Sequence, residues 1–165
     1  MTTKEEQKKD ITNKKSPLTC FDLWVMFDHA SFAIARTRAL ELANFGLTIE
    51  QAAVLHDLIR RGGSATLSEI AESTMRQYHS VSTLVNRMTK AGLTKKVKYS
   101  DTKKYQVSIT EKGFDIYSKV SRNSIEMTFS VLSPSNQKVF AKQLQHLIAR
   151  ARNLLGLDYK HPFLP

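Results

Sequence analysis

Cysteine is almost absent from this chain of 165 residues. Cys20 is the only one, so no disulfide can form within the chain, and a small secreted fold held by disulfides is excluded. A single thiolate cannot make a cysteine-type zinc site either, and no two of the five histidines are spaced three or four residues apart, as a helical ligand pair requires. We therefore expect no metal site and a reducing, cytoplasmic environment.

Long hydrophobic runs are also missing. No stretch approaches the roughly 18 uninterrupted apolar residues that cross a bilayer. Residues 1–15 contain five lysines and three acidic residues but no apolar segment, unlike a signal or transit peptide. Residues 1–15 contain too few apolar groups to offset the entropy lost on folding, so we expect them to form a disordered tail. Because long apolar runs are missing, we also expect no membrane partner.

Glycine is scarce, and its positions argue against an enzyme. The six glycines stand near the ends of expected helices and form no phosphate-binding loop. The sequence also shows no nucleophile paired with a base and no paired carboxylates. We expect no catalytic residues and no cofactor.

Positive charge is abundant and concentrated. Lysine and arginine number 25 against 15 acidic residues, which gives a formal net charge of +10. Between Glu72 and Glu111 there are eight basic side chains and one acidic residue, Asp101, so this segment alone carries +7. A basic segment of this density is typical of a surface that binds the phosphates of nucleic acid, although a solvated basic surface remains the alternative.

Helix signals divide most of the chain. Ser16 and Pro17 predict the start of one long first helix, which would end near Gly46. Thr48 with Gln51, and Thr66 with Glu69, have the spacing of capping boxes, and a glycine pair at 62–63 would end the second helix. Its apolar stripe is Ala52, Leu55, Leu58 and Ile59.

A second pair of helices and a hairpin follow. Apolar residues at helical spacing predict a helix that ends at Gly92, and they are Val81, Leu84, Val85 and Met88. The apolar period then changes from 3.6 to 2, which predicts strands within 93–99 and 105–109 joined by a turn at 100–103. Thr110 would cap a helix reaching Met127, and Ser133 with Pro134 would begin the last one.

Four segments in this order resemble the winged helix-turn-helix of the MarR (multiple antibiotic resistance regulator) family. They are Thr66–Glu72, His79–Met88 followed by Ala91–Leu93, the wing tip Asp101–Lys103, and Ile109–Gly113. Two positions depart from the family pattern: Lys103 stands where the family has an arginine, and Gln77 where it has a better helix N-cap.

The resemblance implies a mostly α-helical fold with a small β-hairpin wing. Residues 47–110 would form the winged helix-turn-helix, residues 16–46 and 111–156 would form dimerisation helices, and residues 157–165 a C-terminal tail. The protein would be a homodimeric repressor that binds double-stranded DNA at a pseudo-palindromic site. Residues 77–91 would read the major groove and the wing, 93–110, would contact the backbone or minor groove.

The expected DNA-binding side chains lie on one face of the recognition helix and on the wing. Asparagine can pair with adenine, serine and threonine can bond several base edges, and the basic residues would contact phosphates. These candidates are Arg76, His79, Ser80, Ser82, Thr83, Asn86, Arg87, Lys90, Lys98, Lys103 and Lys104. The alternative function is a winged-helix module that binds another protein.

Two further features have ordinary explanations. Cys20 has no tyrosine near it in the sequence and no basic cluster, so we interpret it as a small buried side chain, with a redox sensor as the alternative. Trp24, Phe27 and Phe32 could line a crevice for a small-molecule effector, but aromatic residues at helical spacing are more often core. The effector is therefore left open.

Overall fold

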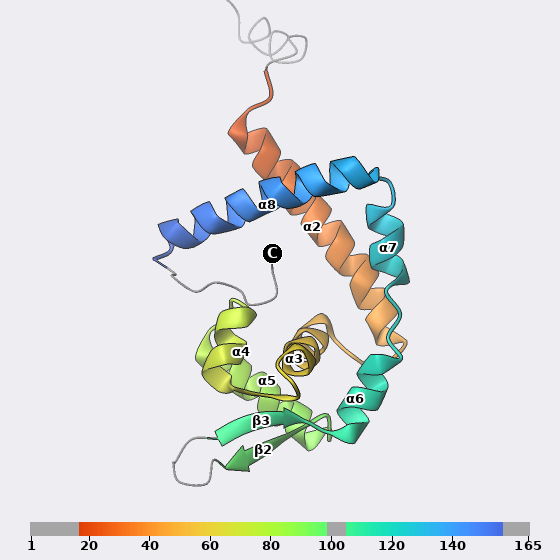
Figure 1. Ribbon diagram of the computed structural model, residues 1–165, viewed down its shortest axis with the longest axis vertical. Helices are drawn as coiled ribbons and strands as arrows, with labels where there is room; N and C mark the ends of the chain where they lie inside the picture. The colour runs from red at the N-terminus through yellow and green to blue at the C-terminus, as the bar shows by residue number, and fades with distance from the viewer. Residues whose placement is uncertain (1–16, 99–104, 157–165) are drawn as a thin grey trace, which may run out of the picture. The chain divides into compact units, whose positions relative to one another are not determined.

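The computed structural model describes residues 17–98 and 105–156 (Figure 1). It is mostly helical with a small antiparallel sheet. The chain divides into two compact units, residues 1–33 and residues 34–165, and the boundary falls inside the helix α2 (Cys20–Ala43). The second unit contains all the other elements and the whole buried core.

Helix α2 begins later than predicted. The Thr19 amide donates to the Asp22 carboxylate at 2.9 Å, and the Asp22 amide donates to the Thr19 hydroxyl at 3.1 Å. This reciprocal pair satisfies donors of the first turn, so the helix starts at Cys20. The predicted N-cap, Ser16, lies outside the described residues.

The remaining elements follow the expected order with two differences, an added strand and a predicted helix that is divided in two. The capping boxes at Thr48 and Thr66 are both confirmed. Ser133 caps the last helix with Pro134 in its first turn, also as predicted. The elements are α3 (Ile49–Arg60), β1 (Ser64–Thr66), α4 (Leu67–Ser73), α5 (Tyr78–Lys90), β2 (Thr94–Lys98), β3 (Tyr105–Ile109), α6 (Glu111–Ser118), α7 (Asn123–Phe129) and α8 (Pro134–Leu154).

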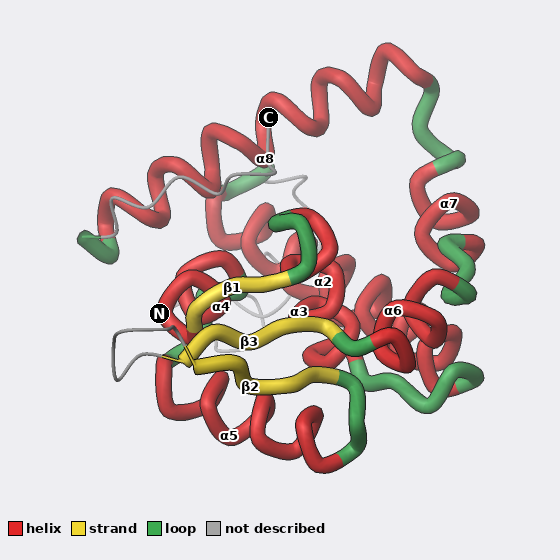
Figure 2. The backbone as a smooth tube through the Cα atoms, turned by 60° about the horizontal axis from the view of Figure 1, so that its bottom comes forward, coloured by secondary structure: helices red, strands yellow, loops and turns green. Residues whose placement is uncertain are grey.

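The sheet has three strands in the order β1-β3-β2, with β3 in the middle (Figure 2). The hairpin of β2 and β3 was predicted, and its register pairs Lys96 with Val107. Strand β1 was not predicted. Its three residues are too few for an alternating pattern, and it forms because Ala65 pairs with Val107 from the other side.

The core lies between α3, α4, α5 and the sheet. Leu55, Leu58, Ile70, Val85 and Met88 are fully buried there. Helices α7 and α8 contribute no buried residue. The described residues therefore form one well-packed module, and the later helices carry exposed apolar side chains.

The helix predicted from Thr110 to Met127 is two helices. The chain leaves α6 after Ser118 and enters α7 at Asn123. At the break, Glu41 of α2 accepts hydrogen bonds from the hydroxyls of Ser121 and Ser124, and Arg38 donates to the Ser121 carbonyl at 2.6 Å. These tertiary bonds occupy polar groups that a continuous helix would orient differently.

The same contacts determine the charge state of Glu41. The hydroxyls of Ser121 and Ser124, followed by Arg38, lower the pKa of Glu41 to about 2. The carboxylate is therefore ionised throughout the neutral range. It ties the end of α2 to the start of α7 as a hydrogen-bonded anion.

A left-handed residue ends α4 in the turn of the helix-turn-helix. Met75 has φ of 52°, and its amide donates to the Glu72 carbonyl at 3.2 Å while the Arg76 amide donates to the Ala71 carbonyl at 2.9 Å. This is a Schellman C-cap, which glycine usually provides. Gly92 occupies the equivalent position after α5, with φ of 75°.

We predict that Met75→Gly raises the free energy of unfolding by about 0.5–1 kcal/mol, because glycine adopts positive φ without a Cβ penalty. The matched reverse change, Gly92→Ala, should lower it, since its φ is equally unfavourable for alanine. Urea denaturation followed by circular dichroism measures both. If the Met75→Gly protein is less stable than the parent, the packing of the Met75 side chain contributes more stability than its positive φ costs.

Candidate nucleic-acid interface

Helix α5 is amphipathic. Val81, Leu84, Val85 and Met88 are buried in the core, as the sequence predicted. The opposite face is open, and Thr83 and Asn86 lie on it exposed. Of the other candidates, Arg76, His79, Ser80, Arg87, Lys90 and Lys98 are exposed, Ser82 is partly buried, and Lys103 and Lys104 lie outside the described residues.

The start of α5 has no side-chain cap. Gln77 occupies the N-cap position without a capping hydrogen bond from its side chain, and no acidic residue stands in the first turn. The first-turn amides therefore keep donor capacity at an end where the helix dipole favours an anion. Arg76, one residue earlier, is 3.4 Å from the Glu50 carboxylate in an exposed ion pair, which contributes little stability.

Two polar side chains on the open face are already engaged. The Thr83 hydroxyl donates to the His79 carbonyl at 3.0 Å, so its oxygen is left as an acceptor and its methyl as an apolar contact. The Asn86 amide oxygen accepts a hydrogen bond from Lys96 Nζ at 2.6 Å. The structure therefore shows which hydrogen-bonding groups of Thr83 and Asn86 are already engaged. Contact of these side chains with a DNA base remains a prediction.

Strand β2 adds basic groups beside α5. Lys95, Lys96 and Lys98 are all exposed along this edge strand. Lys98 was among the predicted site residues, but Lys95 and Lys96 were missed as individual contacts. The signal that could have found them is the density of lysine in this strand, three of its five residues.

The C-terminal end of α5 is anchored by α6. Lys112 Nζ donates to the Ala91 carbonyl at 2.9 Å, and the Thr110 hydroxyl donates to the Gly92 carbonyl at 2.6 Å. Gly113 allows the approach, because a Cβ there would lie 2.2 Å from the Leu93 carbonyl oxygen. The position of α5 is therefore tied to that of α6.

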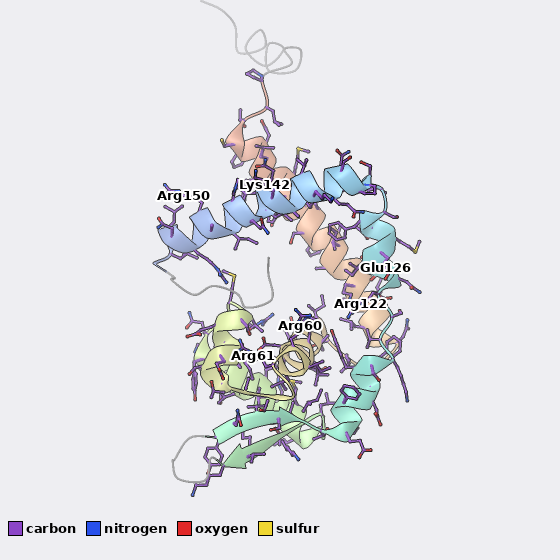
Figure 3. All side chains as sticks on the ribbon, viewed as in Figure 1. Arg60, Arg61, Arg122, Glu126, Lys142 and Arg150 are labelled. Atoms are coloured by element: carbon purple, nitrogen blue, oxygen red, sulfur yellow. The ribbon has the colours of Figure 1, made fainter. Side chains whose placement is uncertain are left out.

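A cavity of about 440 Å³ lies on the other side of α6, near the start of α7. Figure 3 marks Arg122 and Glu126 at this place. Burial raises the pKa of the Tyr117 phenol, which is therefore a neutral donor at physiological pH. The lining residues are Arg38, Ile59, Phe114, Tyr117, Ser118, Val120, Arg122 and Glu126. Apolar walls, the phenol and the exposed guanidinium group of Arg122 suit a small aromatic molecule with a polar group, because Arg38 is already paired with Glu41.

Two expectations about the first helix are wrong. Cys20 is exposed, because it stands at the first residue of α2 where nothing in the described chain packs on it. Trp24, Phe27 and Phe32 are exposed by 60%, 52% and 70%, so they are not core within the chain. None of the three lines the cavity described above.

The described residues, 17–98 and 105–156, contain no group of three or more histidine, cysteine or acidic side chains arranged to hold a metal ion. None of the helices in those ranges is long and apolar enough to cross a membrane.

Comparison with known proteins identifies the domain. The family model of the winged helix DNA-binding domain matches residues 47–113. These residues contain α3 to β3 and the first turn of α6, which include the buried core and the open face of α5. The comparison with curated proteins yields no match.

Solved structures resemble nearly the whole chain. The organohalide-sensing transcriptional regulator RdhR-CbdbA1625, in its 2,4-dichlorophenol-bound form, is 28% identical, with a TM-score of 0.72 over 91% of this chain and 93% of that one. AbsC, a MarR family transcriptional regulator from Streptomyces coelicolor, is 23% identical, with a TM-score of 0.75 over 84% of this chain and 99% of that one.

A third structure is a cysteine-to-serine mutant of MarR from E. coli complexed with operator DNA. It is 16% identical, with a TM-score of 0.70 over 76% of this chain and 94% of that one. Residues 47–113 therefore resemble a winged helix DNA-binding domain, and the chain has the fold of the MarR-family transcriptional regulators.

Proposed function

We propose that this protein is a homodimeric, sequence-specific DNA-binding repressor in which each protomer places α5 in the major groove. The observation that carries the proposal is the exposed face of α5 beside the lysines of β2. Neutral groups able to bond base edges, such as Thr83, lie next to cations able to bind phosphate. A structural relative bound to operator DNA supports the same use of the fold.

Phosphate contacts would come from both sides of the open face. Arg87 and Lys90 extend from the last turn of α5, while Lys95 and Lys98 extend from β2. The uncapped first-turn amides of α5 supply a further anion site. The predicted wing contacts of Lys103 and Lys104 belong to this proposal and lie outside the described residues.

The dimer is proposed from apolar surface that one chain leaves uncovered. On α8, Leu147 is 60% exposed and Phe140 40%, and Met127 of α7 is 74% exposed. Exposed apolar patches of this kind mark protein interfaces. A second copy is the occupant we propose, because a two-fold pair spaces two recognition helices about one DNA turn apart and so reads a pseudo-palindromic site.

The alternative, a winged-helix module that binds another protein, would favour an apolar or acidic wing. Val97 of β2 and Tyr105 of β3 are exposed, but β2 also carries three lysines. The positive charge therefore favours DNA. Binding to duplex DNA at physiological salt separates the two functions.

Our prediction for DNA is a steep salt dependence. If the dimer neutralises about six to ten phosphates, log affinity should fall against log salt concentration with a slope of about −5 to −9. Lys98→Ala should weaken binding to cognate and random duplexes alike and reduce the slope by about one for each cation removed. Fluorescence anisotropy with labelled duplexes at several salt concentrations measures both effects, and a slope near zero would contradict DNA binding.

A second prediction concerns the dimer. Leu147→Glu should give monomers, because it buries a carboxylate in the proposed apolar seam without disturbing the core of one chain. Ala149→Glu is the matched control, since Ala149 is also exposed on α8 but points to the other side of the helix. Sedimentation velocity measures whether each variant is a monomer or a dimer, and Ala149→Glu should remain a dimer. A dimeric Leu147→Glu protein would place the interface elsewhere.

We also propose that the cavity beside α6 binds a small aromatic molecule, such as a phenol, as an effector. Its walls combine Ile59 and Phe114 with the Tyr117 phenol and the guanidinium group of Arg122. The relative crystallised with 2,4-dichlorophenol supports an effector of this kind. A ligand there would touch α6, which also holds the end of α5.

Thermal unfolding tests the effector. We expect 2,4-dichlorophenol to raise the melting temperature of the parent, because ligand binding stabilises the folded state by mass action. Arg122→Gln should reduce that increase while leaving the melting temperature without ligand close to the parent value, since Arg122 is exposed. An unchanged melting temperature of the parent at millimolar ligand would contradict this effector class.

A further inference from the structure

The contact between Asn86 and Lys96 joins the recognition helix to the wing strand. Lys96 Nζ lies 2.6 Å from Asn86 Oδ1, and both side chains are exposed. An ammonium group can only donate hydrogen bonds, so the amide oxygen must be the acceptor. The NH₂ group of Asn86 is then the unhindered part of the amide, and it is a donor only, while the oxygen keeps one lone pair beside the ammonium group.

The sheet register explains why Lys96 reaches α5. Lys96 pairs with Val107, which is fully buried, and cross-strand partners point to the same face of a sheet. Thr94, two residues earlier on that face, lies 3.2 Å from the Thr89 hydroxyl of α5. The contact of Lys96 with Asn86 therefore continues the packing of β2 on α5 by one helical turn.

We propose that Lys96 is a positioning residue that sets the base preference of Asn86. The inference rests on the proposed function, in which α5 enters the major groove. Bidentate recognition of adenine by asparagine needs the amide oxygen to accept from N6 while the NH₂ group donates to N7. Lys96 takes one of the two lone pairs of that oxygen and places its ammonium group beside the other, so a second donor such as adenine N6 is hindered from approaching while the NH₂ group stays free to donate.

Guanine is the base that a donor-only group selects. Its major-groove edge offers two acceptors, N7 and O6, whereas adenine offers one acceptor and one donor. Held by Lys96, Asn86 therefore selects guanine over adenine at one position of each half-site.

The experiment is selection from a pool of randomised duplexes with the full-length protein. The parent should enrich guanine at one position of each half-site. Lys96→Met frees the amide oxygen of Asn86, so the preference for guanine over adenine there should fall by about tenfold, the discrimination expected of one bidentate contact. Lys96→Arg retains a hydrogen-bond donor and should retain the preference for guanine.

Lys95→Met is the matched control. It removes the same charge from the neighbouring position of β2, but Lys95 pairs with Ser108 on the opposite face of the sheet. Both methionine variants should lose affinity for random duplex to a similar extent, and only Lys96→Met should change the base preference. In an Asn86→Ala background, Lys96→Met should have no effect on that preference, because it acts through Asn86.

The outcomes separate this inference from the proposed function. Loss of all salt-dependent duplex binding by the parent would overturn the proposed function itself. Intact binding with adenine enriched by the parent, or with Lys95→Met and Lys96→Met changing base preference alike, would overturn only the role of Lys96. Melting temperatures equal to that of the parent show that the variants are folded.

Discussion

Burial of the apolar side of α5 is the constraint on which the DNA-facing surface depends. Val81, Val85 and Met88 have no exposed surface, and truncating side chains of this kind in a packed core costs about 2–5 kcal/mol. Rotation of α5 about its axis would expose them. The core therefore fixes which residues face outward, and Thr83 and Asn86 owe their positions to packing that takes place on the opposite side of the helix.

Helix α6 extends this constraint to the rest of the second unit. Its first turn holds the end of α5 through Thr110 and Lys112, and its later residues, Phe114 and Tyr117, line the cavity. Because Gly113 lies against the Leu93 carbonyl, α6 has little room to slide without moving the end of α5. The same helix therefore lines the cavity and contacts the end of α5.

Local signals in the sequence predicted much of this arrangement. The threonine capping boxes, the glycine after α5 and the apolar stripe are properties of neighbouring residues, and all are confirmed. Features made by distant residues were missed: β1 exists only by pairing with β3, and the break before α7 coincides with hydrogen bonds from Glu41. The contact between Lys96 and Asn86 belongs to the same group, since it depends on strand register and side-chain reach.

The central claim is that one surface, formed by the open face of α5 and by β2, binds DNA. Nuclear magnetic resonance of the isotope-labelled protein during titration with a duplex tests it most directly. The account predicts that chemical-shift changes concentrate on the amides of α5, β2 and β3 and on the side-chain amide of Asn86. Changes concentrated on α7 and α8, with α5 unaffected at saturating DNA, would contradict it.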